Sequence, residues 1–182
     1  MRILGISGSL RRGSHNRTLL RAAADALPPG VDLAEWDGLA DLPAFDEDRE
    51  KAPAEPVRAF LEEIASADAL LIATPEYNAS LPGALKNAID WASRPFPDNV
   101  LRYKPTAVVG ASTGLFGAVW AQAEVRKVLG ATGAEVVDRE LPVMQAHAQF
   151  DEYGNLVEED LRGQLAEHVA ALVAAAGKKV AA

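Results

Sequence analysis

The stretch GISGSLRRGSHN, residues 5–16, joins an apolar segment to a segment with helical periodicity. It is rich in glycine, serine and arginine, which suits a short loop with exposed backbone and polar side chains. When such a loop leaves a strand and enters a helix, the free N–H groups and the dipole of the helix favour a negatively charged group. The stretch therefore predicts a strand, an anion-binding loop and a helix, in that order.

Two common phosphate-binding loops do not match this stretch. Gly8 and Gly13 have the spacing of a Walker loop, but Ser14 and His15 follow where that loop has lysine and then serine or threonine. The glycines also miss the G-x-G-x-x-G spacing of a dinucleotide fold, although Asp37 lies at a plausible distance along the chain for a ribose contact. A phosphatase loop would need a cysteine nucleophile, and the chain contains no cysteine.

The remaining interpretation is a loop that binds a terminal phosphate without transferring it. The hydroxyls of Ser7, Ser9 and Ser14, the Asn16 amide and the Arg11 guanidinium are hydrogen-bonding groups suited to a phosphate monoester. The alternative is an ordinary glycine-rich turn, in which Ser14 or Asn16 only caps the helix.

The composition predicts one compact domain over residues 1–182. The chain is 49% hydrophobic, lacks cysteine and carries a formal charge of -8, so we expect an ample core without disulfides. The negative charge opposes binding to nucleic acid or to anionic membranes. No apolar run approaches the roughly 20 residues of a membrane span, and the chain enters a strand at once, so we expect a cytoplasmic protein. The three histidines show no ligand spacing, so no metal site is expected.

Apolar runs typical of buried strands alternate with segments of helical period. Parallel strands joined by right-handed helical crossovers form a doubly wound α/β sheet, which binds ligands beyond the carboxyl ends of its strands. We predict a five-stranded parallel sheet in the flavodoxin-like order 2-1-3-4-5. The expected strands are residues 2–7, 31–37, 67–75, 105–112 and 134–143, and the expected helices are residues 16–27, 55–66, 82–93, 118–131 and about 158–176.

Two further loops would meet the first one at the carboxyl edge of this sheet. Residues 74–95, TPEYNASLPGALKNAIDWASRP, follow the third strand and expose polar groups, and Ser80 is expected to cap the next helix. Residues 110–122, GASTGLFGAVWAQ, follow the fourth strand with small residues that let a ligand approach the backbone. In the flavodoxin-like order these loops converge on the topological switch point, whose characteristic occupant is flavin mononucleotide (FMN).

Two other segments have competing interpretations. The charged, proline-rich segment at residues 42–56 is expected to be a solvated loop, with a lid over the site as the alternative. The helix after residue 82 carries an apolar stripe that is expected to be core, or otherwise a subunit contact. The stripe consists of Leu85, Ala88, Ile89 and Trp91.

Three segments together resemble the NADPH-dependent FMN reductase family, most closely its quinone and chromate reductase branch. These segments are GSLRRGSHN (residues 8–16), PEYNASLPGALKNAIDW (75–91) and GASTGLFGA (110–118). LPVMQAHAQFDEYGNL, residues 141–156, is similar to the last strand of that branch and the segment after it. The resemblance covers nearly the whole chain, and the motifs are more specific jointly than singly.

The resemblance implies three groups of flavin contacts. The first loop would hold the FMN phosphate, the second would line the isoalloxazine and the ribityl chain, and the third would contact the flavin from the other side. Tyr77 would also contact the electron acceptor. The implied residues are Ser9, Arg11, Ser14 and Asn16 in the first group, Pro75, Glu76, Tyr77 and Asn78 in the second, and Ser112, Thr113 and Gly114 in the third.

The resemblance also implies an oxidoreductase whose chemistry resides in FMN, so no catalytic side chain is expected. NADPH or NADH would give hydride to flavin N5, and a quinone or similar planar acceptor would then take two electrons at the same face. Arg12 and Arg17 would either attract the 2'-phosphate of NADPH or be solvated. Members of the branch form homodimers or homotetramers, with the helix at residues 85–91 near the partner. Trp120 and Ala123 stand where chromate-reducing relatives have arginine and tyrosine.

Other functions are compatible with the same sequence. A flavodoxin-type electron carrier would bind FMN and dock on a protein partner, and a flavin-binding module would hold FMN without a catalytic role. Neither would have a nicotinamide site. A Rossmann-type dehydrogenase fits less well, because its glycine spacing is missing.

Overall fold

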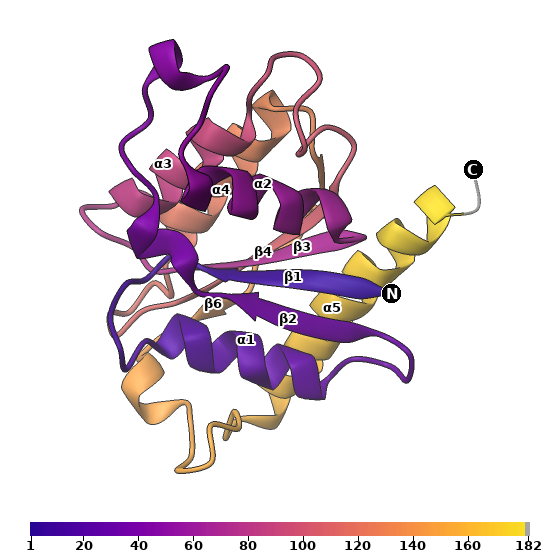
Figure 1. Cartoon of the computed structure of the whole chain (residues 1–182). Coiled ribbons are helices and arrows are strands. Elements are labelled where there is room, and N and C mark those ends of the chain that lie inside the picture. Colours follow the sequence, from indigo (N-terminus) through magenta and orange to yellow (C-terminus); the bar gives the residue numbers. More distant parts are fainter. Residues whose placement is uncertain (181–182) are drawn as a thin grey trace.

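A parallel six-stranded sheet forms the centre of the structure, a computed structural model that describes residues 1–180 (Figure 1). Five strands follow the order β2-β1-β3-β4-β5, and β6 pairs with β4 beyond the end of β5. The predicted order 2-1-3-4-5 is therefore confirmed. The strands are β1 (Arg2–Ser7), β2 (Asp32–Trp36), β3 (Ala69–Thr74), β4 (Pro105–Ala111), β5 (Glu135–Val136) and β6 (Pro142–Val143).

Helices cover both faces of the sheet, because successive residues of a buried strand point to opposite sides. On β3, Leu70 and Ile72 join the hydrophobic cluster under α2, α3 and α4, whereas Leu71 and Ala73 join the cluster under α1 and α5. Figure 1 shows these two helical layers above and below the sheet. The helices are α1 (His15–Asp25), α2 (Glu55–Ser66), α3 (Gly83–Ala92), α4 (Val119–Ala131) and α5 (Glu159–Val180).

The predicted strand at residues 134–143 is wrong as a single element. The structure contains β5 and β6 instead, separated by residues 137–141. The side chain of Gln122 explains the second contact with β4: its Oε1 accepts from the Leu141 N–H at 3.1 Å, and its Nε2 donates to the Leu141 carbonyl at 3.2 Å. The Gln122 amide from α4 therefore bonds both backbone groups of Leu141, the residue before β6. This contact holds the chain near β4, so that β6 pairs with β4 after residues 137–141 have left it.

Helix α3 corrects one expectation and confirms another. Ser80 does not cap α3, whose N-cap is Pro82 without a side-chain hydrogen bond. The apolar stripe of α3 is core as expected, since Leu85 and Trp91 are only 1% and 2% exposed.

The loop at residues 42–56 contains a short 3-10 turn, Glu47–Arg49. The predicted domain range ends at residue 182, and residues 181–182 lie outside the described part of the chain. Within residues 1–180, no helix has both the length and the apolar character needed to cross a membrane.

A buried histidine lies under β4. His168 on α5 is 1% exposed, and its Nε2 has no hydrogen-bond partner in the described part of the chain. Burial, reinforced by the charges of Arg139 and Arg126, lowers the pKa of His168 to about 4, although a hydrogen bond to the Val108 backbone acts in the opposite direction. The imidazole is consequently neutral in the folded protein at pH 7.

Acidification should therefore destabilise the protein through His168. Its pKa falls from 6.5 to about 4 on folding, so only the unfolded chain binds the proton between these values, and stability is lost as the pH falls from about 6.5 to 4. The full contribution is about 3 kcal/mol. Asparagine in His168→Asn can still donate a hydrogen bond to Val108 but does not titrate. Urea unfolding should show that the free energy of unfolding depends less steeply on pH in this variant than in the wild type. Equal slopes would contradict this assignment.

Candidate functional site

The loop after β1 and the first turn of α1 form a polar cradle. Ser14 is the N-cap of α1, and its Oγ accepts from the Asn16 N–H at 3.2 Å. Ser9 Oγ accepts from the Arg11 N–H at 3.3 Å. Both serines are buried, at 5% exposure for Ser9 and 3% for Ser14. Because these contacts use only the acceptor capacity of the hydroxyls, each serine still has a hydrogen to donate to an anion.

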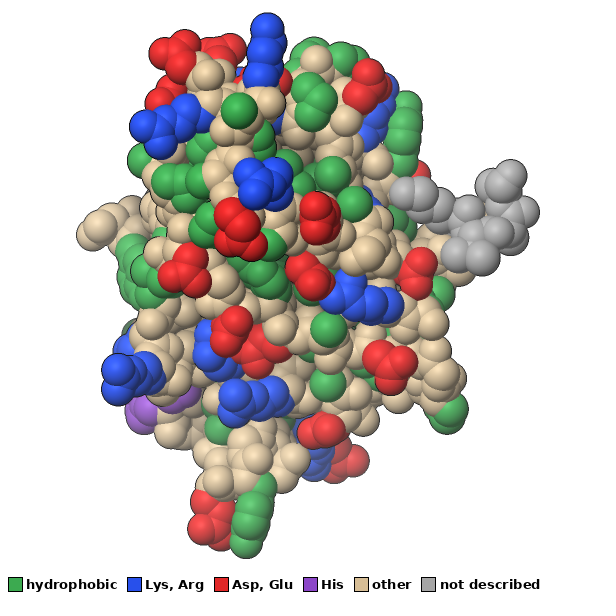
Figure 2. Space-filling view, viewed as in Figure 1, with side chains coloured by type: hydrophobic (Ala, Val, Ile, Leu, Met, Phe, Trp, Pro, Cys, Tyr) green, Lys and Arg blue, Asp and Glu red, His purple; other side chains and the backbone are tan. Residues whose placement is uncertain are grey.

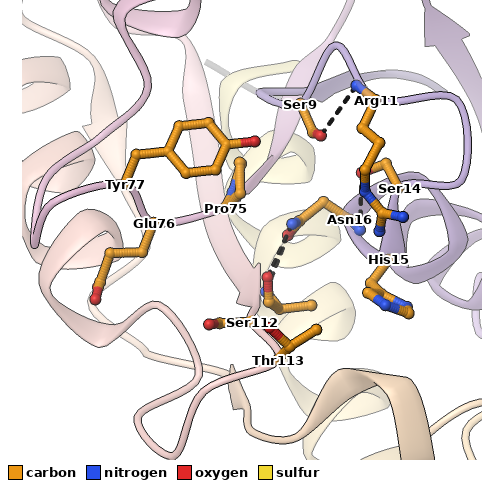
Figure 3. A pocket seen from close by; sticks show the side chains of 11 residues that line it. Ser9, Arg11, Ser14, His15, Asn16, Pro75, Glu76, Tyr77, Ser112 and Thr113 are labelled. Carbon is orange, nitrogen blue, oxygen red and sulfur yellow. Dashed lines mark hydrogen bonds between the residues drawn. The ribbon is translucent and has the colours of Figure 1, made fainter.

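Arg11 supplies a positive charge that the protein does not neutralise. Within residues 1–180 it forms no ion pair, and its side chain lies beside Ser14 and His15 (Figure 3). Burial, followed by the charges of Arg11 and His147, lowers the pKa of His15. A cation next to helix N–H groups is the arrangement that binds a phosphate or another anion.

Arg17 has an ion-pair partner within the chain. Its Nε lies 2.6 Å from Glu35 Oε1 on β2, so this guanidinium is paired within the chain. Arg17 is consequently neither free for the 2'-phosphate of a nucleotide nor simply solvated. Arg12 is exposed and does not line the cavity described below.

The Asn16 side chain has partners within the chain, and its predicted contact with the phosphate stays a prediction. Its Nδ2 donates to the Ala111 carbonyl at 2.9 Å, and its Oδ1 accepts from the Ala111 N–H at 2.9 Å. Asn16 is 3% exposed. The amide thus joins α1 to the end of β4 and leaves only the second Nδ2 hydrogen uncommitted. Its observed role is to position the first loop against the third one.

The second wall is a tight turn after β3. Tyr77 and Ser80 exchange backbone hydrogen bonds at 3.1 Å, and Asn78 and Ala79 adopt left-handed φ values of 54° and 58°. The turn leaves Tyr77 52% exposed, with its ring toward the cavity and opposite the first loop (Figure 3). This ring offers a flat surface to a planar ligand.

Glu76 lines the cavity, and its predicted contact with the flavin stays a prediction, but its carboxylate has partners within the chain. Its Oε2 accepts from the N–H groups of Trp120 at 3.0 Å and Ala121 at 3.1 Å, at the start of α4. In return Glu124 of α4 accepts from the Ser80 hydroxyl at 2.6 Å and from the Leu81 N–H at 3.1 Å. These hydrogen bonds lower the pKa of Glu124. Two carboxylates therefore fix the second wall to α4, and Glu76 contributes to the cavity without pointing into it (Figure 3).

The third wall is the chain that leaves β4. Ser112 and Thr113 line the cavity, and the Ser112 N–H donates to Val143 of β6. The Gly114 N–H donates to Ser112 Oγ at 3.1 Å. Gly110 allows α4 to approach closely here, because a Cβ at this position would lie 2.8 Å from the Gln122 amide nitrogen.

The three walls enclose a cavity of about 220 Å³ at the carboxyl edge of the sheet (Figure 3). Of the eleven predicted residues, Asn78 and Gly114 lie outside its lining. His15 and Ala111 line the cavity but were not predicted; His15 stands beside the helix cap in the first motif, a signal that could have identified it. The predicted residues that the fold brings together are Ser9, Arg11, Ser14, Asn16, Pro75, Glu76, Tyr77, Ser112 and Thr113.

This arrangement suits a ligand with a phosphate at one end and a flat ring at the other. Two buried hydroxyls, an unpaired guanidinium and a helix N-terminus meet the requirements of a phosphate, and the opposite wall carries Tyr77 and Pro75. Pockets that enclose whole drug-sized ligands measure roughly 300–1,000 Å³, so this smaller cavity would cover only part of a flavin and leave the rest open. Among the described residues, no cluster of three His, Cys, Asp or Glu side chains could hold a metal ion.

Comparison with known proteins gives a consistent result. The family model for NADPH-dependent FMN reductases matches residues 1–148. The chain is 41% identical over 174 residues to an NAD(P)H-dependent FMN reductase of Pseudomonas aeruginosa, covering 94% of this chain and 93% of that one. It is 39% identical over 166 residues to a 2-hydroxy-1,4-benzoquinone reductase of a Burkholderia species, covering 91% and 90%. The solved structure of FerB, a flavoenzyme NAD(P)H:(acceptor) oxidoreductase of Paracoccus denitrificans, has a TM-score of 0.88 and 33% identity, with 97% of each chain covered.

Proposed function

The chain belongs to the NADPH-dependent FMN reductase family, and from that premise we propose that it is an FMN-dependent oxidoreductase that transfers reducing equivalents from NADPH or NADH to quinones. The observation that carries this proposal is the anion cradle of the first loop, which opens onto the flat wall formed by Tyr77 and Pro75. This combination fits FMN, which has a phosphate at one end and a planar ring at the other. The quinone as acceptor is supported by the names of two relatives, a 2-hydroxy-1,4-benzoquinone reductase and a quinone reductase of Escherichia coli.

In this proposal the residues of the chain bind and orient, and none acts as a general base. Arg11, Ser9 and Ser14 hold the FMN phosphate, aided by the N–H groups at the start of α1. Tyr77, Pro75 and the residues after β4 hold the ring. Asn78 and Gly114 do not line the cavity, and their contacts with FMN stay a prediction. FMN, when bound at these residues, would supply the redox chemistry, which is hydride acceptance from the nicotinamide and two-electron reduction of the acceptor.

One open side of the site would serve both substrates in turn. A nicotinamide and a quinone are both planar, and each must approach the ring from the side that the protein leaves uncovered. We infer a ping-pong sequence, in which the oxidised nicotinamide leaves before the acceptor enters. Orientation over the ring is then the main contribution of the protein to the rate. Residues 1–182 would form one FMN-binding domain, and a cytoplasmic location stays a prediction.

The proposal is tested by assaying the FMN-loaded protein anaerobically. NADPH or NADH should be consumed continuously only when both FMN and 1,4-benzoquinone are present, and double-reciprocal plots at several quinone concentrations should be parallel. The protein without FMN is the control. Flavin that stays oxidised in the presence of both donors would favour the electron carrier or the flavin-binding module, because neither has a nicotinamide site.

Arg11→Ala should weaken FMN binding, because it removes a charged hydrogen-bond donor from the phosphate cradle. The expected loss is about 1.5–3 kcal/mol, or about ten- to 150-fold in Kd, as measured by quenching of FMN fluorescence. Arg12→Ala is the matched control, since Arg12 is the exposed neighbour outside the cavity lining. Equal FMN affinity in the two variants would remove Arg11 from the proposed site.

The apolar side chains around the site also support self-association. Six large apolar residues, five from the loops after β1, β3, β4 and β6 and one from the first turn of α4, are about half exposed or more, which is a typical feature of a protein interface. We infer a homodimer or homotetramer that uses this surface. The residues are Leu10, Tyr77, Leu115, Phe116, Trp120 and Met144.

Light scattering should give two or four times the chain mass of 19.3 kDa. Phe116→Glu should lower that mass, because Phe116 is 59% exposed and packs on Trp120 at a ring-centroid distance of 4.9 Å. Arg58→Glu is the control, because it also introduces a glutamate but lies on α2, outside these loops. A wild-type mass of one chain at all concentrations would contradict the assembly.

A further inference from the structure

A second cavity begins where the proposed flavin site ends. It has a volume of about 390 Å³, and His15 lines both cavities. One wall is α1, and the other is the segment from Ala146 to Gly154, which forms a turn closed by a bridge between Phe150 and Leu156. Figure 3 shows His15 across the first cavity from Tyr77, on the side of the phosphate loop. The second cavity therefore extends the site away from the ring end.

The chemistry of its lining suits a nucleoside. The rings of His15 and Phe150 are nearly parallel, with an interplanar angle of 6° and centroids 6.1 Å apart, and both line the cavity. Purine bases stack on such aromatic faces. Asp25 and Glu152 also line the cavity and form no ion pair within residues 1–180, and free carboxylates accept hydrogen bonds from ribose hydroxyls.

Not every acidic group in the cavity is available. Asp151 accepts hydrogen bonds from the backbone of Tyr153 and from Asn155, so its carboxylate is committed to the turn. His147 is exposed and lines the same cavity. With Arg11 it places positive or protonatable groups around His15, where the two cavities meet. Because Arg11 is assigned to the FMN phosphate, a diphosphate at this junction would be contacted by the ring nitrogens of His15 and His147.

In the proposed reaction, one half of the nicotinamide donor has no binding site among the residues described so far. FMN ends at its phosphate, and a quinone is no larger than the ring region. Only the nicotinamide donor has a second half, consisting of a diphosphate, a ribose and adenine. We propose that the cavity between α1 and residues 146–154 binds the adenosine half of the nicotinamide donor, with the diphosphate beside His15. This inference rests on the proposed function, and it names the determinant of donor affinity within it.

The test compares a full donor with a truncated one on the FMN-loaded protein. Phe150→Leu keeps an apolar side chain in the turn but removes the aromatic face, so it should raise the KM of NADPH or NADH about five- to tenfold with kcat unchanged. Reduced nicotinamide riboside lacks the adenosine half, so its kinetic parameters should not change. His147→Ala should act in the same direction. Phe96→Leu is the matched control, because Phe96 is 69% exposed and lines neither cavity.

Calorimetric titration with ADP-ribose supplies a readout that does not depend on turnover. Wild type and Phe96→Leu should bind ADP-ribose alike, and Phe150→Leu should bind it more weakly by the same factor as the change in KM. The inference is overturned if Phe150→Leu and His147→Ala bind ADP-ribose as the wild type does, or if they impair the full and the truncated donors equally. A loaded wild type that oxidises neither donor would overturn the proposed function, while the titration would still decide what the cavity binds.

Discussion

The site depends on one side-chain amide. Asn16 exchanges two 2.9 Å hydrogen bonds with the N–H and C=O of Ala111, across 95 residues of chain. These bonds set the start of α1, which forms part of the anion cradle, against the end of β4, which provides the third wall. A buried backbone pair left without these partners would cost about 1–3 kcal/mol per group. Gln122 makes the same kind of contact with Leu141. Two amides therefore complete the carboxyl edge of the sheet where regular strand pairing stops.

The remaining wall is held by carboxylates. Glu76 accepts from the first N–H groups of α4, and Glu124 accepts from Ser80 and Leu81 in the turn after β3. This pairing has a clear physical reason, because the turn contains two left-handed residues, Asn78 and Ala79, whose conformation is unfavourable unless its surroundings enforce it. Ala118 and Gln145 are also left-handed and also lie in loops after β4 and β6. Four of the five non-glycine residues with positive φ in the described chain thus lie in the loops after β3, β4 and β6, and the fifth, Tyr103, precedes β4.

The charged side chains differ in whether they have partners within the chain. Acidic and basic side chains are interspersed on the face shown in Figure 2, and Arg17 is paired with Glu35. Arg11, by contrast, has no ion-pair partner within the described residues and lines the first cavity, next to His15, which lines both cavities. An acidic chain can bind an anionic cofactor because the local field of one guanidinium and one helix N-terminus exceeds the effect of the net charge at this short range.

The sequence by itself determined the alternation of strands and helices and the three loops that meet at the site, because hydrophobic periodicity and glycine placement are local signals. The strand order followed from analogy with flavodoxin-like sheets and not from a local signal. It also identified nine of the residues that line the cavity. Only the tertiary structure decided what each side chain does there. Asn16 and Glu76 have the residue types of ligand contacts, yet their partners are backbone groups 95 and 44 residues away. The split of β5 from β6 was equally hidden, since it depends on Gln122 reaching across from α4. Such long-range hydrogen bonds leave no periodic trace in the chain, so only the assembled fold reveals them.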